Sequence, residues 1–337
     1  MSVSPEAAGG QGPDTTALLE GWRGLSEVAG GDRLFRTRRL PRPHGLDLRI
    51  GLRETDAAPC LVIEPGTAGQ AVGAFETAGL RLSRAADPAG VLLVLSLEEP
   101  SRRDLFAEIC SDCIRSVLRA EVQGAGDLLP VLAARLSAWR TFLRDSAAGL
   151  SLREIVGIIG ELLVLDRLLD VDADGVALWK APDDGLHDFE LSRHAVEVKT
   201  SLGPARRMHI STLDQLDDAG LASLHAAHVR LIEAADGETL DQIAARISAR
   251  LSGERERSAF VNALLRRGVP PNGPADAGPR VGCAGVDFYV VRDGFPRLRR
   301  GDVALGIAEA EYQVEVRALT GFAADAEVVL ARFGGER

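Results

Sequence analysis

The sequence predicts a protein of the α/β type in the broad sense, an α+β chain in which helices and strands both contribute to the cores. Hydrophobic residues make up 46% of the 337 residues, which is enough for packed cores in two or three domains. Short alternating or apolar stretches typical of strands occur on both sides of long stretches with helical periodicity. No apolar run reaches the roughly 18 residues of a membrane span. With no signal-peptide pattern near Met1, we expect a cytoplasmic protein without a membrane partner.

The first third of the chain predicts a tail followed by a β-rich region. Residues 1–16 are rich in Gly, Pro and Ala and predict a disordered tail. Residues 17–122 are interpreted as a β-rich scaffold or recognition domain with no chemistry of its own. Its patterns predict three strands and then one helix, at 46–52, 60–63, 90–97 and 103–120.

The middle region, residues 123–235, begins with two predicted helices. An apolar stripe predicts a helix at 127–144, and Ser151 with Glu154 forms a capping-box pattern that begins a second helix ending near Leu169. A tight turn then joins two short strand patterns, Ser211 is expected to cap a further short helix, and another strand follows. These strand patterns lie at 189–191, 195–200 and 224–233.

The last region, residues 236–337, predicts helices and then strands. Amphipathic patterns predict helices at 239–251 and 254–267, and a Pro/Gly-rich link follows at 270–279. Three late strands are expected at 286–291, 303–308 and 313–319.

Charge and cysteine content exclude some classes of protein. A net charge of −10 argues against a broad, nonspecific nucleic-acid coat, but it leaves room for a DNA enzyme with local basic side chains. The four cysteines do not form a disulfide framework in a chain of this size. No phosphate-binding glycine loop, zinc-protease motif or serine-hydrolase motif is found, so any ATP-driven step would need another protein.

One lysine is the most informative residue of the chain. The sequence contains 39 Lys and Arg residues, and only Lys180 and Lys199 are lysines. Lysine is a compact ammonium and arginine a delocalised cation, so the two are not interchangeable at a chemical site. Lys199 closes the string that begins at Asp188 and includes Glu197. An acid, a hairpin and then acid-x-lysine is the pattern by which a nuclease gathers carboxylates and an ammonium around a metal.

The hairpin geometry predicts a metal site. Residues two apart on a strand share a face, so Glu197 and Lys199 point to one side and Val196 and Val198 to the other. Pairing across the turn brings Asp188 near Glu197. Two neighbouring carboxylates repel unless a cation lies between them, and hard oxygen ligands suit Mg²⁺. Lys199 is then placed to orient the attacking water or to offset developing charge.

A structural interpretation of the hairpin stays open. In it, the acids and the lysine form exposed cross-strand ion pairs that contribute little to stability. Which acid begins the motif is also open, because Asp183 follows Pro182 and would complete a literal Pro-Asp. We prefer Asp188, because it borders the strand and Pro-Asp-Asp-Gly is typical of a turn.

Neighbouring residues add candidates. Glu161 lies among apolar residues on the second helix, where a carboxylate is costly unless it is paired or bound to a metal. Arg206, Arg207 and His209 lead to the helix expected at Ser211, and helix N-termini attract phosphate, so these four residues are candidate DNA contacts. One turn later, Gln215 could contact DNA or position water.

These residues resemble the PD-(D/E)XK nuclease superfamily and, more narrowly, a restriction-associated family of such proteins. The resemblance rests on Glu161, on Asp188 with its neighbours, on Glu197-Val-Lys199-Thr200 and on the segment from His209 to Gln215. The superfamily pattern covers residues 151–233, and the narrower one extends through most of the chain. This sequence departs from the motif at His187, which stands where the motif has a proline.

The resemblance implies a restriction-endonuclease-like αβββαβ core with a mixed central sheet. It implies that Asp188, Glu197 and the Val198 carbonyl bind Mg²⁺, that Lys199 assists the attacking water and that Glu161 supports the site. The leading hypothesis is a Mg²⁺-dependent DNA endonuclease of a restriction or anti-phage system. Its partners would be DNA, a second copy of the chain, and ATPase or methyltransferase components. The rival hypothesis is an inactive DNA-binding or assembly subunit that keeps the nuclease fold.

Overall fold

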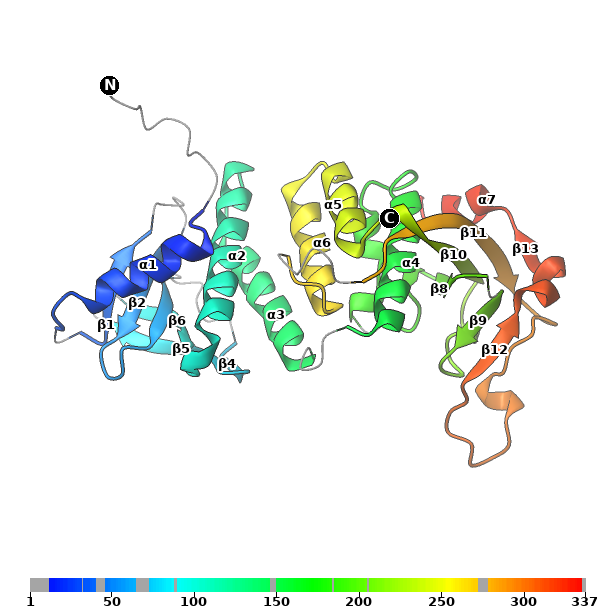
Figure 1. Cartoon of the computed structure of the whole chain (residues 1–337). Coiled ribbons are helices and arrows are strands. Elements are labelled where there is room, and N and C mark those ends of the chain that lie inside the picture. Colours follow the sequence, from blue (N-terminus) through cyan, green and yellow to red (C-terminus); the bar gives the residue numbers. More distant parts are fainter. Residues whose placement is uncertain are drawn as a thin grey trace, which may run out of the picture. The chain divides into compact units, whose positions relative to one another are not determined.

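A computed structural model describes most of the chain (Figure 1), namely residues 12–31, 33–40, 46–64, 73–87, 90–145, 150–183, 185–204, 206–271 and 278–334. The chain divides into two compact units, Met1–Ala147 and Ala148–Arg337. The boundary predicted at 122/123 lies between two helices that pack together within the first unit. Among the described residues, no helix is long and apolar enough to cross a membrane.

The N-terminal unit is built on a six-stranded antiparallel sheet with the order β1-β2-β3-β6-β5-β4. The strands are β1 (Phe35–Arg39), β2 (Asp47–Arg53), β3 (Pro59–Glu64), β4 (Phe75–Thr77), β5 (Leu80–Asp87) and β6 (Gly90–Leu97). The helices are α1 (Thr15–Ser26), the short 3-10 turn η2 (Pro100–Arg102), α2 (Arg103–Val122) and α3 (Leu129–Asp145). Helix α1 packs on β2 and α2, and α2 packs on α3. The three predicted strands and both predicted helices of this unit are confirmed.

Helix α1 corrects part of the predicted tail. Residues 1–11 lie outside the described residues, but a helix begins at Thr15, inside the segment predicted to be disordered. The Asp14 side chain accepts a hydrogen bond from the backbone N–H of Ala17 and caps the helix. Leu18, Trp22 and Leu25, which follow the predicted tail, are buried, so the packing of this helix also orders the last residues of the segment predicted to be disordered.

The C-terminal unit contains a mixed five-stranded sheet with the order β13-β11-β10-β8-β7. The strands are β7 (Phe189–Leu191), β8 (His194–Leu202), β10 (Ser223–Glu238), β11 (Val281–Val291) and β13 (Ala323–Ala324). Strands β8 and β10 run parallel, and the other neighbours are antiparallel. The predicted fold class, helices flanking a mixed sheet, is confirmed.

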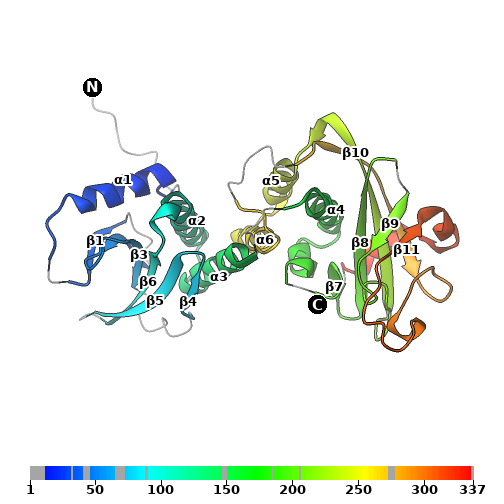
Figure 2. The same ribbon diagram turned by 60° about the horizontal axis from the view of Figure 1, so that its bottom comes forward.

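The remaining elements of this unit are helices and a separate ribbon. The helices are α4 (Leu152–Leu168), α5 (Leu240–Arg250), α6 (Glu254–Arg266) and α7 (Ala326–Ala331), with the 3-10 turns η3 (Gly175–Leu178), η4 (Ala181–Asp183), η5 (Arg300–Asp302) and η6 (Val316–Phe322). The ribbon pairs β9 (Arg207–Ile210) with β12 (Tyr312–Glu315). Figure 2 shows α4 and α5 on the same side of the sheet that contains β8, β10 and β11.

Helix α4 follows the local signals of the sequence. The Ser151 hydroxyl accepts a hydrogen bond from the Glu154 backbone N–H, and the Glu154 side chain accepts one from the Ser151 backbone N–H, which is the predicted capping box. The buried face of the helix packs on β8. At Gly160 a Cβ atom would lie 1.8 Å from the Thr200 hydroxyl, so glycine permits this close approach.

Three predicted elements are wrong. The segment after Ser211 forms turns instead of a short helix, because side chains take the backbone donors there: Gln215 accepts from the Ser211 N–H and Asp217 from the Ala219 N–H. Residues 303–308 form a turn closed at Gly306, which has φ +97°, instead of a strand. The strand predicted at 313–319 ends at Glu315 and continues as η6.

Candidate active site

The β7–β8 hairpin brings the predicted acids together. Phe189 pairs with Val196 and Leu191 with His194, around a turn in which Ser192 has φ +55°. Asp188 lies directly before β7, and its Oδ2 accepts a hydrogen bond from the Val198 backbone N–H at 2.6 Å. The carboxyl group is therefore fixed beside the strand that carries the other two motif residues.

The alternation of β8 separates the charged residues from the apolar ones, as the sequence predicted. Val196 and Val198 belong to the hydrophobic core that includes α4. Glu197 and Lys199 lie on the opposite face of the strand. The Lys199 Nζ donates to the Glu197 Oε1 at 2.7 Å, and the two residues are 9% and 3% exposed. An exposed hairpin with solvated ion pairs is thereby excluded, because this pair is buried.

Glu161 contributes a third carboxylate from α4. It is 5% exposed, and its Oε2 accepts from the Trp179 indole N–H at 2.9 Å. Its Oε1 is paired with the guanidinium of Arg267, the residue that follows α6. Neither Trp179 nor Arg267 was among the residues predicted for the site. Arg267 is 106 residues from Glu161 along the chain, and no local pattern joins them.

Burial dominates the electrostatics of the three acids. Burial raises the pKa of Glu197 to about 8, and the Asp188 carboxylate adds to the effect while Lys199 acts against it. Burial likewise raises the pKa of Glu161 to about 7, with Asp188 again adding and Arg267 opposing. The pKa of Asp188 is also raised by burial, although Lys199 and the Val198 N–H favour its ionised form. The site therefore holds more carboxyl groups than its own cations stabilise.

These groups line one pocket of about 570 Å³. The pocket contains every predicted catalytic residue and two of the predicted DNA contacts, namely Glu161, Asp188, Glu197, Val198, Lys199, His209, Ser211 and Gln215. Arg206 and Arg207 are exposed and do not line it. Asp183 does not line it either and is paired with Arg266 at 2.8 Å, so the structure favours Asp188 as the leading acid.

Two further pocket residues have clear local roles. The Gln215 Oε1 accepts from the Ser211 N–H at 2.9 Å, which leaves its amide NH₂ to face other groups. His187, which replaces the motif proline, is 2% exposed, and its Nδ1 lies 3.6 Å from the Glu190 carboxylate. Burial lowers the pKa of His187, which favours the neutral imidazole, while the Glu190 carboxylate acts against this shift.

The donor set fits a small divalent cation. Among the described residues, no three His, Cys, Asp or Glu side chains form a complete metal cluster. Mg²⁺ needs only one or two carboxylates and keeps several waters. Asp188 and Glu197 supply two carboxyl groups whose pKa values are raised by burial, and bound positive charge would stabilise both in the ionised form.

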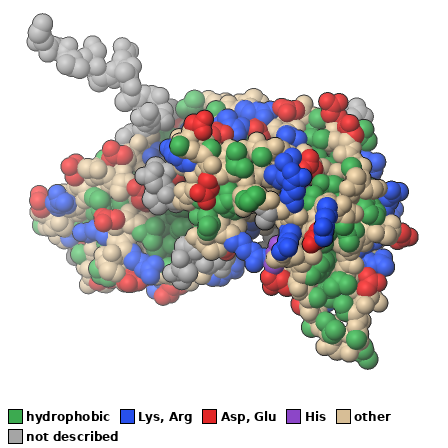
Figure 3. Space-filling model, turned by 45° about the vertical axis from the view of Figure 1, so that its right-hand side comes forward, with side chains coloured by type: hydrophobic (Ala, Val, Ile, Leu, Met, Phe, Trp, Pro, Cys, Tyr) green, Lys and Arg blue, Asp and Glu red, His purple; other side chains and the backbone are tan. Residues whose placement is uncertain are grey.

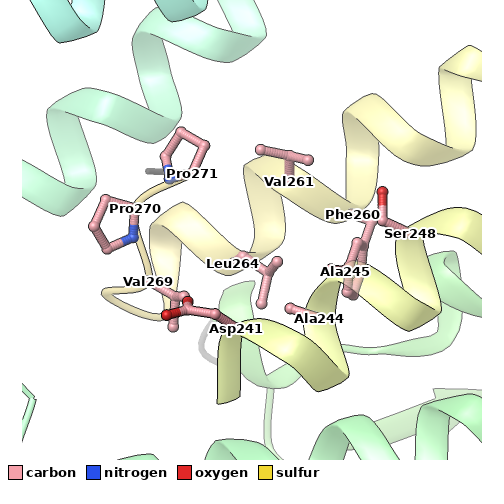
Figure 4. Close-up of a pocket in the computed structure, with 10 residues that line it drawn as sticks. All are labelled: Asp241, Ala244, Ala245, Ser248, Phe260, Val261, Leu264, Val269, Pro270 and Pro271. Atoms are coloured by element: carbon pink, nitrogen blue, oxygen red, sulfur yellow. The ribbon is translucent and has the colours of Figure 1, made fainter. Parts of the chain in front are cut away.

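The pocket lining carries mixed charge, with the basic residues Arg153, Lys199 and Arg267 beside the acids Glu154, Glu161, Asp188, Glu197 and Glu311. Figure 3 shows Lys and Arg side chains interspersed with Asp and Glu on the visible surface, without one broad basic patch. A second pocket, of about 340 Å³, lies between α5 and α6 (Figure 4). Its lining is mainly apolar and includes a single carboxylate, Asp241. Paired acids therefore distinguish the first pocket as the candidate active site.

Comparison with known proteins gives one match. A family model described as "Putative PD-(D/E)XK family member, (DUF4420)" matches residues 18–317. No curated protein and no solved structure matches the chain. The matched range covers most of both units and includes all the motif residues described above. The chain belongs to this family, whose description relates it to the PD-(D/E)XK group.

Proposed function

We propose that the chain is a Mg²⁺-dependent DNA endonuclease that hydrolyses phosphodiester bonds. The observation that carries the proposal is the meeting of Asp188, Glu197 and Lys199 in one pocket. Family membership supports the nuclease class. A restriction or anti-phage role is the finer part of the proposal, and the resemblance of the motif residues to a restriction-associated family supports it.

Each residue has a role that its surroundings allow. Asp188, Glu197 and the Val198 carbonyl would hold the Mg²⁺, which would supply Lewis-acid polarisation of the scissile phosphate and activation of a water. Lys199 would orient the attacking water and offset negative charge as it develops. Glu161, held by Trp179 and Arg267, would keep negative charge next to Asp188. Gln215 would position water or DNA through its amide NH₂.

The first experiment compares plasmid cleavage by the wild-type chain with that by Lys199→Ala and Asp188→Ala in the presence of Mg²⁺. We expect both variants to lose about 100-fold or more in rate, because each removes a group that acts on the transition state. Lys180→Ala is the matched control. The ammonium of Lys180 donates to the Ala177 carbonyl and does not line the pocket, so its loss should leave cleavage unchanged. Equal cleavage by all four proteins would refute the site assignment.

One observation favours a second candidate, a non-catalytic DNA-binding or assembly subunit. Lys199 and Glu197 already pair with one another at 2.7 Å in a buried environment. In a nuclease, binding of Mg²⁺ would have to separate Lys199 from Glu197. Glu197 could then bind the metal, and Lys199 could turn to the attacking water. A purified protein that binds DNA but cuts none, with either Mg²⁺ or Mn²⁺, would favour the second candidate.

A further inference from the structure

Three polar side chains lie at the rim of the pocket: Arg153, His209 and Glu311. We propose that the Glu311 carboxylate occupies the place of a substrate phosphate between Arg153 and His209. These two basic residues then form a phosphate subsite for the DNA backbone, next to the acids of the candidate active site. The inference rests on the proposed function and adds to it the substrate contact that flanks the scissile bond.

The contacts of Glu311 are those of an anion in a basic site. Its Oε1 lies 2.8 Å from the Nε2 of His209 and 3.8 Å from a guanidinium nitrogen of Arg153. Arg153 also reaches the Ser211 hydroxyl at 3.4 Å. The four residues come from three separate parts of the unit, namely the first turn of α4, the strand β9 with the segment after it, and the residue before β12. One carboxylate oxygen therefore faces a guanidinium and an imidazole at the mouth of the pocket.

Arg153 stands where its own helix does not favour a cation. The N-terminal turn of a helix carries partial positive charge, and acids such as Glu154 are stabilising there. An arginine in this turn adds positive charge to backbone N–H groups that already attract anions. A phosphate at this position would be attracted by both the guanidinium and the helix, whereas Glu311 reaches the guanidinium only at 3.8 Å.

Replacing the Glu311 carboxylate by a phosphate should cost little free energy. The side chains of Arg153 and Glu311 are 65% and 63% exposed, and exposed ion pairs contribute little to stability. A phosphodiester has two free oxygens, so it can accept from the arginine and the histidine together, and arginine–phosphate hydrogen bonds are stronger than neutral ones. Glu311 can then turn outward to water.

The test measures binding separately from cleavage. The Asp188→Asn protein, with Mg²⁺ present, is titrated into a fluorescently labelled DNA duplex, and anisotropy gives the dissociation constant at several salt concentrations. Adding Arg153→Ala should weaken binding by about 5- to 10-fold and reduce the salt slope by about one, as expected for a lost phosphate contact. Adding Glu311→Gln should tighten binding by about 3-fold, because the competing carboxylate is gone.

The combined variant tests the link between the two residues. If Glu311 acts by covering Arg153, the gain from Glu311→Gln should largely disappear once Arg153 is alanine. Arg317→Ala and Glu327→Gln make the same charge changes on exposed residues that do not line the pocket, and they serve as controls. Shifts of the same size in the controls would show that net charge alone is at work and would overturn the subsite.

The outcomes separate the subsite from the nuclease. Unchanged affinity in Arg153→Ala and Glu311→Gln, with cleavage by the chain that retains Asp188, would overturn the subsite and leave the nuclease proposal standing. The expected affinity changes without any cleavage would support the subsite and overturn the nuclease. A chain that binds no duplex at all would overturn both.

Discussion

Each unit of the chain buries a carboxylate between a tryptophan and an arginine, and the two arrangements differ in what surrounds them. In the N-terminal unit, Asp112 accepts from the Trp139 indole N–H at 2.8 Å and lies 3.5 Å from the Nε of Arg135. In the C-terminal unit, Glu161 accepts from Trp179 at 2.9 Å and pairs with Arg267. The same three kinds of side chain thus occur in both cores.

The difference lies in the neighbours of the acid. Asp112 and Arg135 are 2% and 1% exposed, and neither lines the pocket that holds the acid cluster. Glu161 lies beside Asp188 and Glu197 in that pocket, and its arginine remains 30% exposed. A buried carboxylate with an arginine and an indole is therefore a structural element by itself. It gains a chemical role only where further acids and an opening to solvent adjoin it.

The largest effect on stability should come from removing Asp112, the acid of the fully buried arrangement in the N-terminal unit. We expect Asp112→Ala to cost about 3 to 5 kcal/mol of unfolding free energy, because Arg135 loses a buried counter-charge that water cannot replace. Glu161→Ala should cost only about 1 to 3 kcal/mol, because the partly exposed Arg267 can be hydrated. Urea titrations of both variants measure the difference. Equal losses would mean that the two arrangements are energetically alike, against the comparison drawn above.

The rate of DNA cleavage should depend on the charge of Glu161. Glu161→Gln keeps a hydrogen-bond acceptor for Trp179 but removes the negative charge beside Asp188. We expect cleavage to fall by about 10- to 100-fold, within the range that electrostatic contributions to catalysis span, while thermal stability changes little. Asp112→Asn, which makes the matched change in the N-terminal unit, should leave the rate per folded molecule unaltered. A comparable loss of rate in Asp112→Asn would contradict a special role for the pocket.

A pair of glycines on α4 tests how tightly the site depends on the packing of this helix. Gly160→Ala should cost about 1 to 3 kcal/mol, because its Cβ would lie 1.8 Å from the Thr200 hydroxyl. Gly157→Ala, with no atom within 4 Å of the added Cβ, should stabilise the helix by about 0.5 to 1 kcal/mol. Thermal unfolding of the two variants checks the opposite signs, and a destabilised Gly157→Ala would contradict the packing described here.

The smallest effect is expected from pH. The pKa values of Glu161 and Glu197 are raised in the folded protein to about 7 and about 8. Between pH 4.5 and 8 the folded chain therefore holds more protons at these groups than the unfolded chain does, and their contribution to stability falls as the pH rises. Without metal, we expect the unfolding free energy of the C-terminal unit to fall by on the order of 1 kcal/mol between pH 7 and 8. Glu197→Gln should flatten this dependence in differential scanning calorimetry.

The affinity for Mg²⁺ should rise with pH, whereas the stability of the metal-free protein falls. Since bound metal requires ionised carboxylates, its uptake should release protons and its affinity should increase up to about pH 8. Calorimetric titration in buffers of different ionisation enthalpy measures this release. Metal binding that is independent of pH and releases no protons would mean that Asp188 and Glu197 are not the ligands.

The sequence alone determined most of the local structure and the composition of the site. The Ser151 capping box fixed the start of α4, and strand alternation placed Glu197 and Lys199 on the face opposite Val196 and Val198. These features depend on residues a few positions apart, so nearest-neighbour hydrogen bonds and periodicity are sufficient to predict them. The family resemblance drawn from the same residues is confirmed, whereas the catalytic roles assigned to them stay predictions.

Only the tertiary structure decided which partners the motif residues have. It brought Arg267 to Glu161 and Glu311 to His209, and it replaced the helix expected after Ser211 with turns in which Gln215 bonds to the backbone. It also folded part of the expected tail into α1. The Glu161–Arg267 pair joins residues 106 positions apart, and the Glu161 carboxylate lies in a buried site that excludes competing water, which no local pattern in the sequence records.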